Sequence, residues 1–492
     1  MSAVLAKPQV KDFLKTIAKR KEKGQEQRKE HDVNAHAVTA EGEPSKKPWE
    51  EDIPELSSPS YSPPTSFSYS SDSSSSSNPR RRIKKTKRNQ PKKSHHSTTL
   101  IVRGQAHPTS SILEEGILQR QSVASEKAVV AGCGAVSIDY LASVAQFPQP
   151  DEKIRSVDFK VQGGGNAGNC LTATARLGLR PRILSKIAED SFGKLVIDEL
   201  IGDGVDTSFI VVSESGTTSF TYVIVDRNTN TRTCINSPGY PPLMPQELPD
   251  GTLSQILDGA RLLYLDGRLA DTALLLAEEA KRKSIPILVD AERKREGLDD
   301  LLALADYVVC SAKFPQAWTG LPTLPEALVN ISTKLPCLKF VIVTLGAAGC
   351  VMLEKTVDDL THLELLDANK EYELLLERRG HLNLEEPTAI SSKVGLFQQI
   401  GANDDVVKQF AGRLLIGTAE TIPASELVDT TGSGDAFIGA VLYSLCTQMS
   451  TEKMLAFGAA VAGANCRALG ARAGLPYCHD SKLIPFLGIP AV

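Results

Sequence analysis

Apolar runs and helical patterns alternate along the chain from residue 127 almost to its end. Short runs rich in Val, Ile and Leu are typical of buried strands. They occur at 127–144, 181–188, 261–267, 286–292, 306–311 and 339–346. Apolar positions at helical spacing occur between them, at 166–178, 191–204, 270–284 and 323–335. Strands that alternate with helices indicate βαβ units, and therefore an α/β fold around a mostly parallel sheet.

Two kinds of segment interrupt this alternation. Residues 151–164 and 217–236 alternate apolar and polar side chains, as half-exposed antiparallel strands do. They predict a small second sheet that covers part of the larger one. Residues 356–410 have a charged helical pattern at 363–379 and a loop-like stretch at 382–393. We interpret 356–410 as an insertion that lies on the surface.

The first 126 residues have a different composition. Residues 11–32 are almost all charged or polar, and residues 57–78 are dominated by Ser, Pro and Tyr. Such a segment buries too little apolar surface to offset the conformational entropy of the chain. The sequence therefore predicts a disordered extension over 1–126, followed by one folded domain over 127–492.

The extension also carries two targeting-like features. A basic run at 80–93 has the composition of a nuclear-import or nucleic-acid patch, and equally that of a solvated tail. Residues 57–113 contain Asp72 as their one acidic residue, which resembles a plastid transit peptide in composition, although the segment is internal. We expect a cytoplasmic protein, with the plastid as the alternative and the nucleus less favoured.

Bulk composition excludes several classes of protein. The chain has 492 residues, of which 41% are hydrophobic and 23% charged, and its net charge is −4. This near-neutral balance disfavours a protein that mainly binds nucleic acid, and no apolar run reaches the roughly 18 residues of a membrane span. The nine cysteines form no CxxC pair, so we expect reduced core thiols and no zinc site.

Residues 429–437, with the sequence DTTGSGDAF, place two glycines and a carboxylate where an apolar helix begins. At the carboxyl edge of a parallel sheet, such a helix directs free N–H groups and its positive dipole end at a ligand. The motif therefore predicts an anion hole. Asp435 suits two roles, either a helix cap or a base that takes a proton from a hydroxyl group attacking a phosphate.

A second glycine-rich motif, QGGGNAGN, lies at residues 162–169 and also precedes a helical pattern. The amides of Asn166 and Asn169 offer donors and acceptors that suit sugar hydroxyl groups. A tight turn with an asparagine helix cap is the alternative reading. The P-loop pattern GxxxxGK[ST] is absent from the sequence, so Walker-type phosphate binding is not indicated.

In order and separation, the two motifs resemble the signatures of the ribokinase/PfkB family of carbohydrate kinases, over about residues 127–355 and 411–485. The resemblance implies a Rossmann-like three-layer α/β/α fold with a small β-sheet lid, here about 151–165 and 214–240. It also implies transfer of the γ-phosphate of ATP to a primary hydroxyl group of a sugar, with Mg²⁺ and, in some members, K⁺. Lids of this family often pair edge strands into dimers, whereas some members are monomeric, so a homodimer through the lid and a monomer are both open.

The resemblance assigns roles to individual residues. Asp435 corresponds to the general base, and the anion hole corresponds to Gly432, Ser433 and Gly434. The sugar contacts correspond to Asp139 at the end of the first strand, Gly164, Gly165, Asn166 and Asn169. The nucleotide contacts correspond to Thr344, Gly346 and Gly349, to Asn465 in a helix over 458–465 that would flank adenine, and to Gly432 and Gly434.

Three shorter segments are more similar to ketohexokinase-like and fructokinase-like members. Residues 148–156 resemble the entry to the lid, which places Asp151 near the sugar. Residues 231–235 resemble a lid strand whose arginine, here Arg232, approaches the phosphates of ATP. Residues 289–295 resemble a segment in which Asp290 is taken as structural.

One departure from the family bears on the metal. Many members carry an N-x-x-E motif that orders Mg²⁺ through water, whereas this chain has Ser311 to Phe314 there, without a carboxylate. The metal ligands are therefore left unassigned. Three functions remain open: a sugar kinase resembling keto- or fructokinases, a nucleoside kinase of the same family, and a non-catalytic scaffold like the fructokinase-like proteins of plastid transcription complexes.

Overall fold

The computed structural model describes residues 127–356, 362–382, 386–400 and 406–487. The predicted disordered extension and its basic run lie outside these residues. All nine cysteines lie within them, all are free, and six are buried, as expected for reduced core thiols. Of the helices in the described ranges, none is both long and apolar enough to cross a bilayer.

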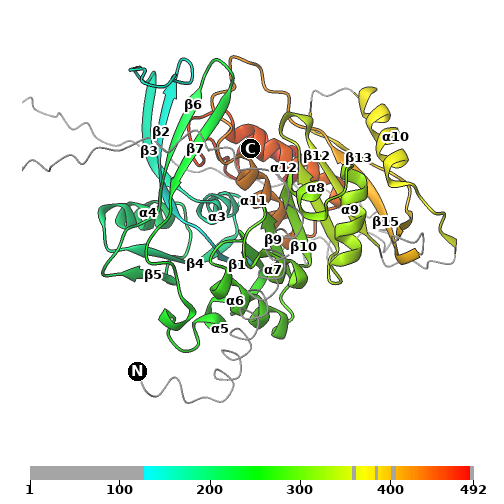
Figure 1. Cartoon of the computed structure of the whole chain (residues 1–492), viewed down its shortest axis with the longest axis horizontal. Helices are drawn as coiled ribbons and strands as arrows, with labels where there is room; N and C mark the ends of the chain where they lie inside the picture. Colours follow the sequence, from blue (N-terminus) through cyan, green and yellow to red (C-terminus); the bar gives the residue numbers. More distant parts are fainter. Residues whose placement is uncertain (1–126, 357–361, 383–385, 401–405, 488–492) are drawn as a thin grey trace, which may run out of the picture. The chain divides into compact units, whose positions relative to one another are not determined.

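The main sheet contains eleven strands among the described residues (Figure 1). Its parallel part runs in the spatial order β5 (Ile210–Ser213), β4 (Arg180–Ala188), β1 (Val129–Cys133), β8 (Ala260–Leu265), β9 (Ile287–Ala291), β10 (Tyr307–Ser311) and β11 (Phe340–Thr344). Its antiparallel part adds β12 (Cys350–Lys355), β15 (Val406–Gly417), β13 (Ala389–Ser391) and β14 (Gly395–Ile400). The sheet is thus mostly parallel, as the alternating pattern predicts.

Helices cover both faces of this sheet, because both faces of its strands are apolar. In β8, Leu263 packs into one core and Tyr264 into the other. The first core lies under α6 (Ala270–Arg282), α7 (Leu298–Leu304), α9 (Leu324–Lys334) and α10 (Ala368–Gly380). The second lies under α3 (Asn166–Arg176), α4 (Ser191–Gly202), α11 (Ser433–Cys446) and α12 (Thr451–Asn465). Shorter helices are α5 (Thr252–Ile256), α8 (Phe314–Thr319), α13 (Ile484–Leu487), η2 (Pro245–Glu247) and η3 (Gly346–Ala348).

A second sheet of four strands forms the lid, in the order β3 (Asp158–Gly164), β2 (Ser137–Val144), β6 (Phe220–Asp226) and β7 (Thr231–Ser237). The two alternating segments supply β3, β6 and β7. The prediction of one continuous strand over 127–144 is wrong, because the chain leaves the main sheet after β1 and enters the lid as β2. Asp139 therefore lies within a lid strand rather than at the end of the first strand.

A side chain from a distant segment contacts the chain at the break between β1 and β2. The backbone amide of Ala135 donates to Oδ2 of Asp266 at 2.7 Å, so a side chain satisfies this amide instead of a neighbouring strand. A Cβ atom on Gly134 would overlap the carboxyl group of Asp266, which explains the glycine at this position. An apolar run alone does not reveal this side-chain contact, which comes from more than a hundred residues downstream.

The segment 356–410 is only partly a surface insertion. Its charged helix forms as α10, but Phe397 and Leu375 are 0% and 1% exposed. The expectation of a surface position is wrong for these side chains, because β14 pairs with β15 and α10 packs on the same core. The segment widens the main sheet at one edge.

Candidate active site

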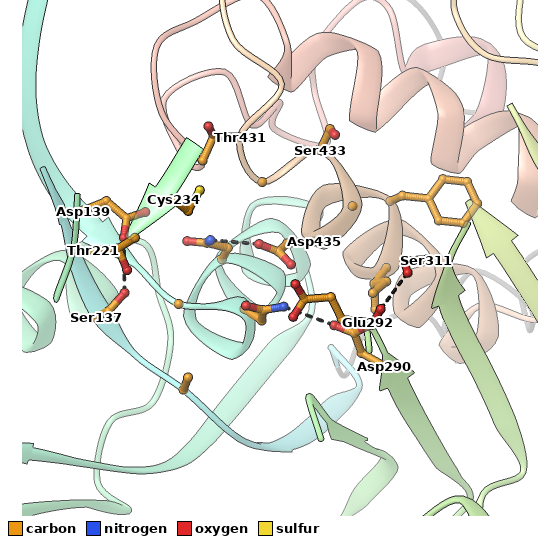
Figure 2. Close-up of a pocket in the computed structure, with 18 of the residues that line it drawn as sticks. Ser137, Asp139, Thr221, Cys234, Asp290, Glu292, Ser311, Thr431, Ser433 and Asp435 are labelled. Atoms are coloured by element: carbon orange, nitrogen blue, oxygen red, sulfur yellow. Dashed lines mark hydrogen bonds between the residues drawn. The ribbon is translucent and has the colours of Figure 1, made fainter. Parts of the chain in front are cut away.

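A cavity of about 970 Å³ lies between the lid and the carboxyl ends of the parallel strands. Figure 2 shows lid residues such as Asp139 and Cys234 on one side of it, and Asp290 and Ser311 at the strand ends. The structure brings together most of the site residues predicted from the sequence. These are Asp139, Gly165, Asn166, Asn169, Arg232, Thr344, Gly346, Gly349, Gly432, Ser433, Gly434 and Asp435.

The N-terminus of α11 faces this cavity. Gly432 precedes the helix with a φ of 72°, and a Cβ atom there would come within 2.6 Å of the Cβ atom of Ala471. Glycine is thus required both for its left-handed backbone and for space. Ser433 N donates to the Thr430 carbonyl at 3.2 Å. The amides of Gly434 and Asp435 precede Ala436, whose amide makes the first bond of the helix, to the Gly432 carbonyl at 2.8 Å. These two amides are thus free of helical acceptors at the end of α11 that faces the cavity, where the sequence predicts an anion hole.

Asp429 holds the loop before α11 in place. Its Oδ1 atom accepts hydrogen bonds from the amide and the hydroxyl of Thr431, at 2.9 and 2.7 Å. Its Oδ2 atom accepts from the amide of Gly470 at 2.9 Å. Asn465 donates from Nδ2 to the Thr431 carbonyl at 3.0 Å. We call residues 429–434 the anion-hole loop, and these bonds fix its shape before any ligand binds.

Asp435 points from the first turn of α11 toward α3 (Figure 2). Its Oδ2 atom accepts a hydrogen bond from Nδ2 of Asn169 at 2.9 Å. Burial raises the pKa of Asp435 to about 7; the bond from Asn169 opposes this effect, and the negative charge of Glu292 adds to it. Neutral side chains also cap helices, and the N-cap residue of α11 is Gly432, so capping does not account for a carboxyl group at Asp435. A pKa near neutrality suits a group that accepts and releases a proton.

The sugar side of the cavity contains a second polar group of residues. Asp139 is 5% exposed, it accepts from the Ser137 hydroxyl at 3.3 Å, and burial raises its pKa to about 6. Gly165, at the N-terminus of α3, has a φ of 84°, and a Cβ atom there would come within 2.7 Å of Cα of Val136. The glycine thus lets α3 begin directly against the lid root, where Asn166 and Asn169 face the cavity.

Three residues near Asn166 line the cavity without having been assigned to the site from the sequence: Asp290, Arg268 and Glu292. Asn166 donates to Oδ2 of Asp290 at 3.5 Å and accepts from Nη2 of Arg268 at 3.3 Å. Asp290, interpreted from the sequence as structural, therefore also lines the cavity. Burial raises its pKa well above the usual range, and the charge of Asp435 adds to this effect. A polar residue at the end of a parallel strand was the available signal for Asp290.

Arg232 reaches from β7 of the lid to the anion-hole loop. Its Nη1 atom donates to the Thr430 hydroxyl at 2.8 Å. A guanidinium group at the mouth of an anion hole adds positive charge beside the N-terminus of α11. The lid thus contributes to the same site as the helix.

The opposite wall of the cavity suits a flat, largely apolar group. Gly346 and Gly349 have φ values of 59° and 87°, and a Cβ atom on Gly349 would overlap the Gly417 carbonyl. Small residues of α12 face them, namely Ala459, Ala462 and Gly463. The glycine turn at 344–349 and the small residues of α12 thus leave space for a ligand between these two segments.

Three residues expected in the site do not line the cavity. Asp151 is exposed in the loop between β2 and β3, with a φ of 62°, so it belongs to the turn rather than to the cavity. Gly164 is buried, and a Cβ atom there would overlap the carboxyl group of Asp139. Asn465 is 0% exposed and supports the anion-hole loop from behind. Gly164 and Asn465 shape the site without facing a ligand.

The cavity offers few ligands for a metal ion. Ser311, at the position of the family's metal motif, donates its hydroxyl to the Glu292 carbonyl at 2.6 Å. The Oε2 atom of Glu292 lies 2.7, 3.5 and 3.7 Å from nitrogen atoms of Arg295, Arg268 and Arg293. Within the described ranges, no group of three His, Cys, Asp or Glu side chains is arranged to hold a metal ion.

The sequence pattern of the pfkB family carbohydrate kinases matches residues 127–364 and 417–478. Mouse ribokinase is 23% identical over 369 residues, which cover 73% of this chain and 96% of the mouse protein. Mouse ketohexokinase is 23% identical over 346 residues, which cover 68% and 94%. These relatives are matched over nearly their whole length.

Solved structures show the same fold. A putative ribokinase from Agrobacterium tumefaciens superposes with a TM-score of 0.56 at 20% identity, over 73% of this chain and 97% of that one. Arabidopsis thaliana ribokinase, solved with ribose and ATP, gives a TM-score of 0.51 at 20% identity, over 74% and 100%. A parallel α/β sheet, a four-stranded lid and a helix N-terminus facing the enclosed cavity define a phosphotransferase of the ribokinase type. The chain belongs to the PfkB family of carbohydrate kinases, which confirms the predicted fold and enzyme class.

Proposed function

We propose that this protein transfers the γ-phosphate of MgATP to a primary hydroxyl group of a sugar, with Asp435 as the general base. The observation that carries the proposal is the position of Asp435. It lies in the cavity, in the first turn of the helix that forms the anion hole, and its pKa is raised to about 7. Relatives named ribokinase and ketohexokinase support a sugar as acceptor.

The residues divide the reaction between them. Asp139, Asn166 and Asn169 are placed to hold the hydroxyl groups of the acceptor beside Asp435. Asp435 takes the proton as the acceptor oxygen bonds to the γ-phosphorus, and the bond from that phosphorus to the bridging oxygen of ADP breaks. The amides of Gly434 and Asp435 and the guanidinium group of Arg232 stabilise the negative charge on the phosphate.

Mg²⁺ is best regarded as part of the MgATP substrate. The cavity carboxylate nearest the family's metal position, Glu292, contacts three arginines instead of being free to coordinate. Bound to the nucleotide, Mg²⁺ would neutralise phosphate charge. Ribokinases of the same fold, solved with ATP and Mg²⁺ or with ADP, support a nucleotide as phosphate donor. We assign it to the wall formed by 344–349 and α12, because glycines and small side chains line the cavity there.

The lid favours a sugar over a nucleoside. Its strands place polar or small side chains toward the cavity, including Asp139, Thr221 and Asn236. The aromatic side chains lie on the opposite face, where Tyr140 and Tyr222 pack with ring centroids 5.5 Å apart. A nucleobase is usually held by aromatic stacking. The aromatic side chains of the lid strands pack against one another on the outer face, and among the lid-strand residues that line the cavity Val223 is apolar rather than aromatic. The intact anion hole and Asp435 likewise disfavour a scaffold without activity.

The outer face of the lid supports a homodimer. Phe159, Tyr222 and Ile235 are 58%, 49% and 54% exposed there, and together they form an apolar surface on one sheet. Exposed apolar patches of this kind mark association sites. Light scattering should give the mass of a dimer for the wild type and of a monomer for Tyr222→Glu. A wild-type monomer at assay concentrations would contradict the dimer.

The test of the function is ADP release by the purified full-length protein with MgATP. Acceptors are fructose, ribose, tagatose, adenosine and inosine, with a reaction lacking acceptor as the blank. We expect a signal that depends on a sugar and is lost in Asp435→Asn, by a factor of about 100 or more. The matched control is Asp271→Asn, an exposed acidic residue in the first turn of α6. Turnover of Asp435→Asn at the wild-type rate would refute the base, and turnover of nucleosides alone would refute the sugar.

A further inference from the structure

Arg472 is a buried cation outside the cavity whose role the reaction scheme above leaves open. It lies in the segment after α12 and is 3% exposed. Its Nε atom donates to Oδ1 of Asn169 at 2.9 Å, and its Nη2 atom donates to the Gly164 carbonyl at 2.8 Å. Its Nη1 atom lies 3.7 Å from Oε2 of Glu199 and has no hydrogen-bond acceptor among the described residues.

The glycine-rich motif provides the space for this guanidinium group. A Cβ atom on Gly163 would overlap Nη1 of Arg472, and one on Gly168 would overlap Nη2. Gly163 also donates its amide to Oε2 of Glu199 at 2.7 Å, which places the counter-charge at the edge of the same slot. Gly163 and Gly168 therefore leave space for the guanidinium group of Arg472, whereas Gly165 is required for its positive φ.

The contact with Asn169 determines which way its amide faces. Arginine only donates hydrogen bonds, so the atom that Asn169 presents to Nε of Arg472 must be its oxygen, Oδ1. The Nδ2 atom must then point the other way, and it donates to Oδ2 of Asp435 at 2.9 Å. A reversed amide would set its N–H groups against the guanidinium and its oxygen against the carboxylate.

We propose that Arg472 is a positioning residue for the phosphotransfer: by fixing the amide of Asn169, it ensures that the general base Asp435 receives a hydrogen-bond donor and stays oriented toward the acceptor. It also joins the root of the lid, at Gly164, to the base. This inference deepens the proposed function and rests on it.

The first test is a double-mutant cycle with Arg472→Met and Asn169→Ala. If Arg472 acts through Asn169, kcat falls on the order of tenfold or more in Arg472→Met, but little further in the double variant than in Asn169→Ala alone. The KM for MgATP changes less than kcat. Equal losses from Arg472→Met in both backgrounds would overturn the proposal, since they would reflect a general structural role.

The second test is the pH profile of kcat/KM. Loss of the donor disfavours the ionised carboxylate, so the rising limb moves to higher pH in Arg472→Met, and Arg472→Lys restores part of the rate. The other charged groups that face Asp435, namely Glu292, Asp290, Asp266 and Arg232, are unchanged in both variants. The charge of Arg472 also lowers the pKa of Asp139, so the shift of the limb is assigned to Asp435 by the stability difference with Asp435→Asn described below. An unmoved limb would overturn the proposal.

A matched control separates positioning from loop anchoring. Arg176 donates from Nη1 to the carbonyls of Arg472 and Leu475, at 2.7 and 3.2 Å, and so anchors the same segment. Arg176→Met is expected to lower the unfolding midpoint and to leave the rising limb of the kcat/KM pH profile unchanged. If it moves the limb as much as Arg472→Met does, anchoring explains the effect and the proposal fails.

A readout without turnover keeps this inference separate from the proposed function. The difference in stability between a protein that carries Asp435 and its Asp435→Asn variant, measured against pH, reports the titration of Asp435 directly. The pH range over which this difference changes should lie higher in the Arg472→Met background. If no acceptor is turned over but this shift occurs, the proposed function fails and the link from Arg472 to Asp435 stands. Without the shift, the link fails.

Discussion

Replacing Asp435 by Asn should change how the stability of the free protein depends on pH. Burial, opposed by the hydrogen bond from Asn169, raises the pKa of Asp435 from 3.8 to about 7. The unfolded chain returns this carboxyl group to its ordinary pKa. The pKa of Asp435 is higher in the folded protein than in the unfolded chain. The free energy that Asp435 contributes to folding is therefore fully present below about pH 4, and it is lost as the pH rises through about 7.

The size of the effect follows from this difference. At about 1.4 kcal/mol per pH unit, the whole shift in the pKa of Asp435 corresponds to about 4 kcal/mol of folding free energy. About half of this free energy is lost between pH 5.5 and 8.5. The Asp435 side chain keeps partial contact with solvent in the cavity, which reduces the expected change in that window to about 1–2 kcal/mol. Asp435→Asn keeps the shape of the side chain and removes its titration.

Urea denaturation at pH values from about 5.5 to 8.5 measures the free energies of unfolding of both proteins. The stability of the wild type relative to Asp435→Asn should decline by the stated amount as the pH rises. Asp139, whose pKa is about 6, titrates in both proteins, so its contribution cancels in the difference. The Asp271→Asn control should give a difference that does not depend on pH. A flat difference for Asp435→Asn would refute the raised pKa.

The same structure supports four shorter predictions. The kcat/KM should rise with pH along a limb near 7, because only ionised Asp435 accepts a proton; a flat pH–rate profile would contradict the base. Gly432→Ala should lose about 1–3 kcal/mol in urea denaturation, since its φ is 72°; an unchanged midpoint would argue against strain. Arg232→Met should raise the KM for MgATP more than that for the acceptor in steady-state kinetics; the reverse order would move Arg232 to the sugar. Phe397→Ala should cost about 3–5 kcal/mol on urea denaturation with kcat/KM unchanged, because Phe397 is 0% exposed in the core and does not line the cavity; a loss below about 1 kcal/mol would contradict that burial.

The sequence reveals those parts of the site that a local backbone requirement determines. Gly432 and Gly165 occupy positive-φ positions directly before helices, so glycine is required where the chain turns toward a ligand. Asp435 and Asn169 follow in the first turns of these helices, at fixed offsets from the glycines. Such short-range constraints leave a pattern that can be read without a structure.

The parts that the sequence does not reveal depend on contacts between distant segments. Asp266 ends β1 through the amide of Ala135, 131 positions away, so the apolar run at 127–144 gives no sign of the break. Arg472 reaches Asn169 across 303 positions, and its own neighbourhood carries no motif. Phe397 is buried because β14 pairs with β15, and the charged helix nearby conceals this.

The lid connects these distant contacts to the chemistry. Burial is the largest cause of the raised pKa of both Asp139 and Asp435, and it is the lid that covers Asp139 and the cavity into which Asp435 points. A lid that opens would hydrate both carboxyl groups and lower their pKa, and one that closes over an acceptor would raise it again. The base is therefore strongest when the site is shut. In the structure, Arg232 reaches from the lid to Thr430 and places positive charge beside the anion-hole loop, and this charge lowers the pKa of Asp435 and so partly opposes the effect of burial. Lid closure and base strength are two consequences of one geometry, so variants that loosen the lid should lower kcat and move the pH limb to lower values together.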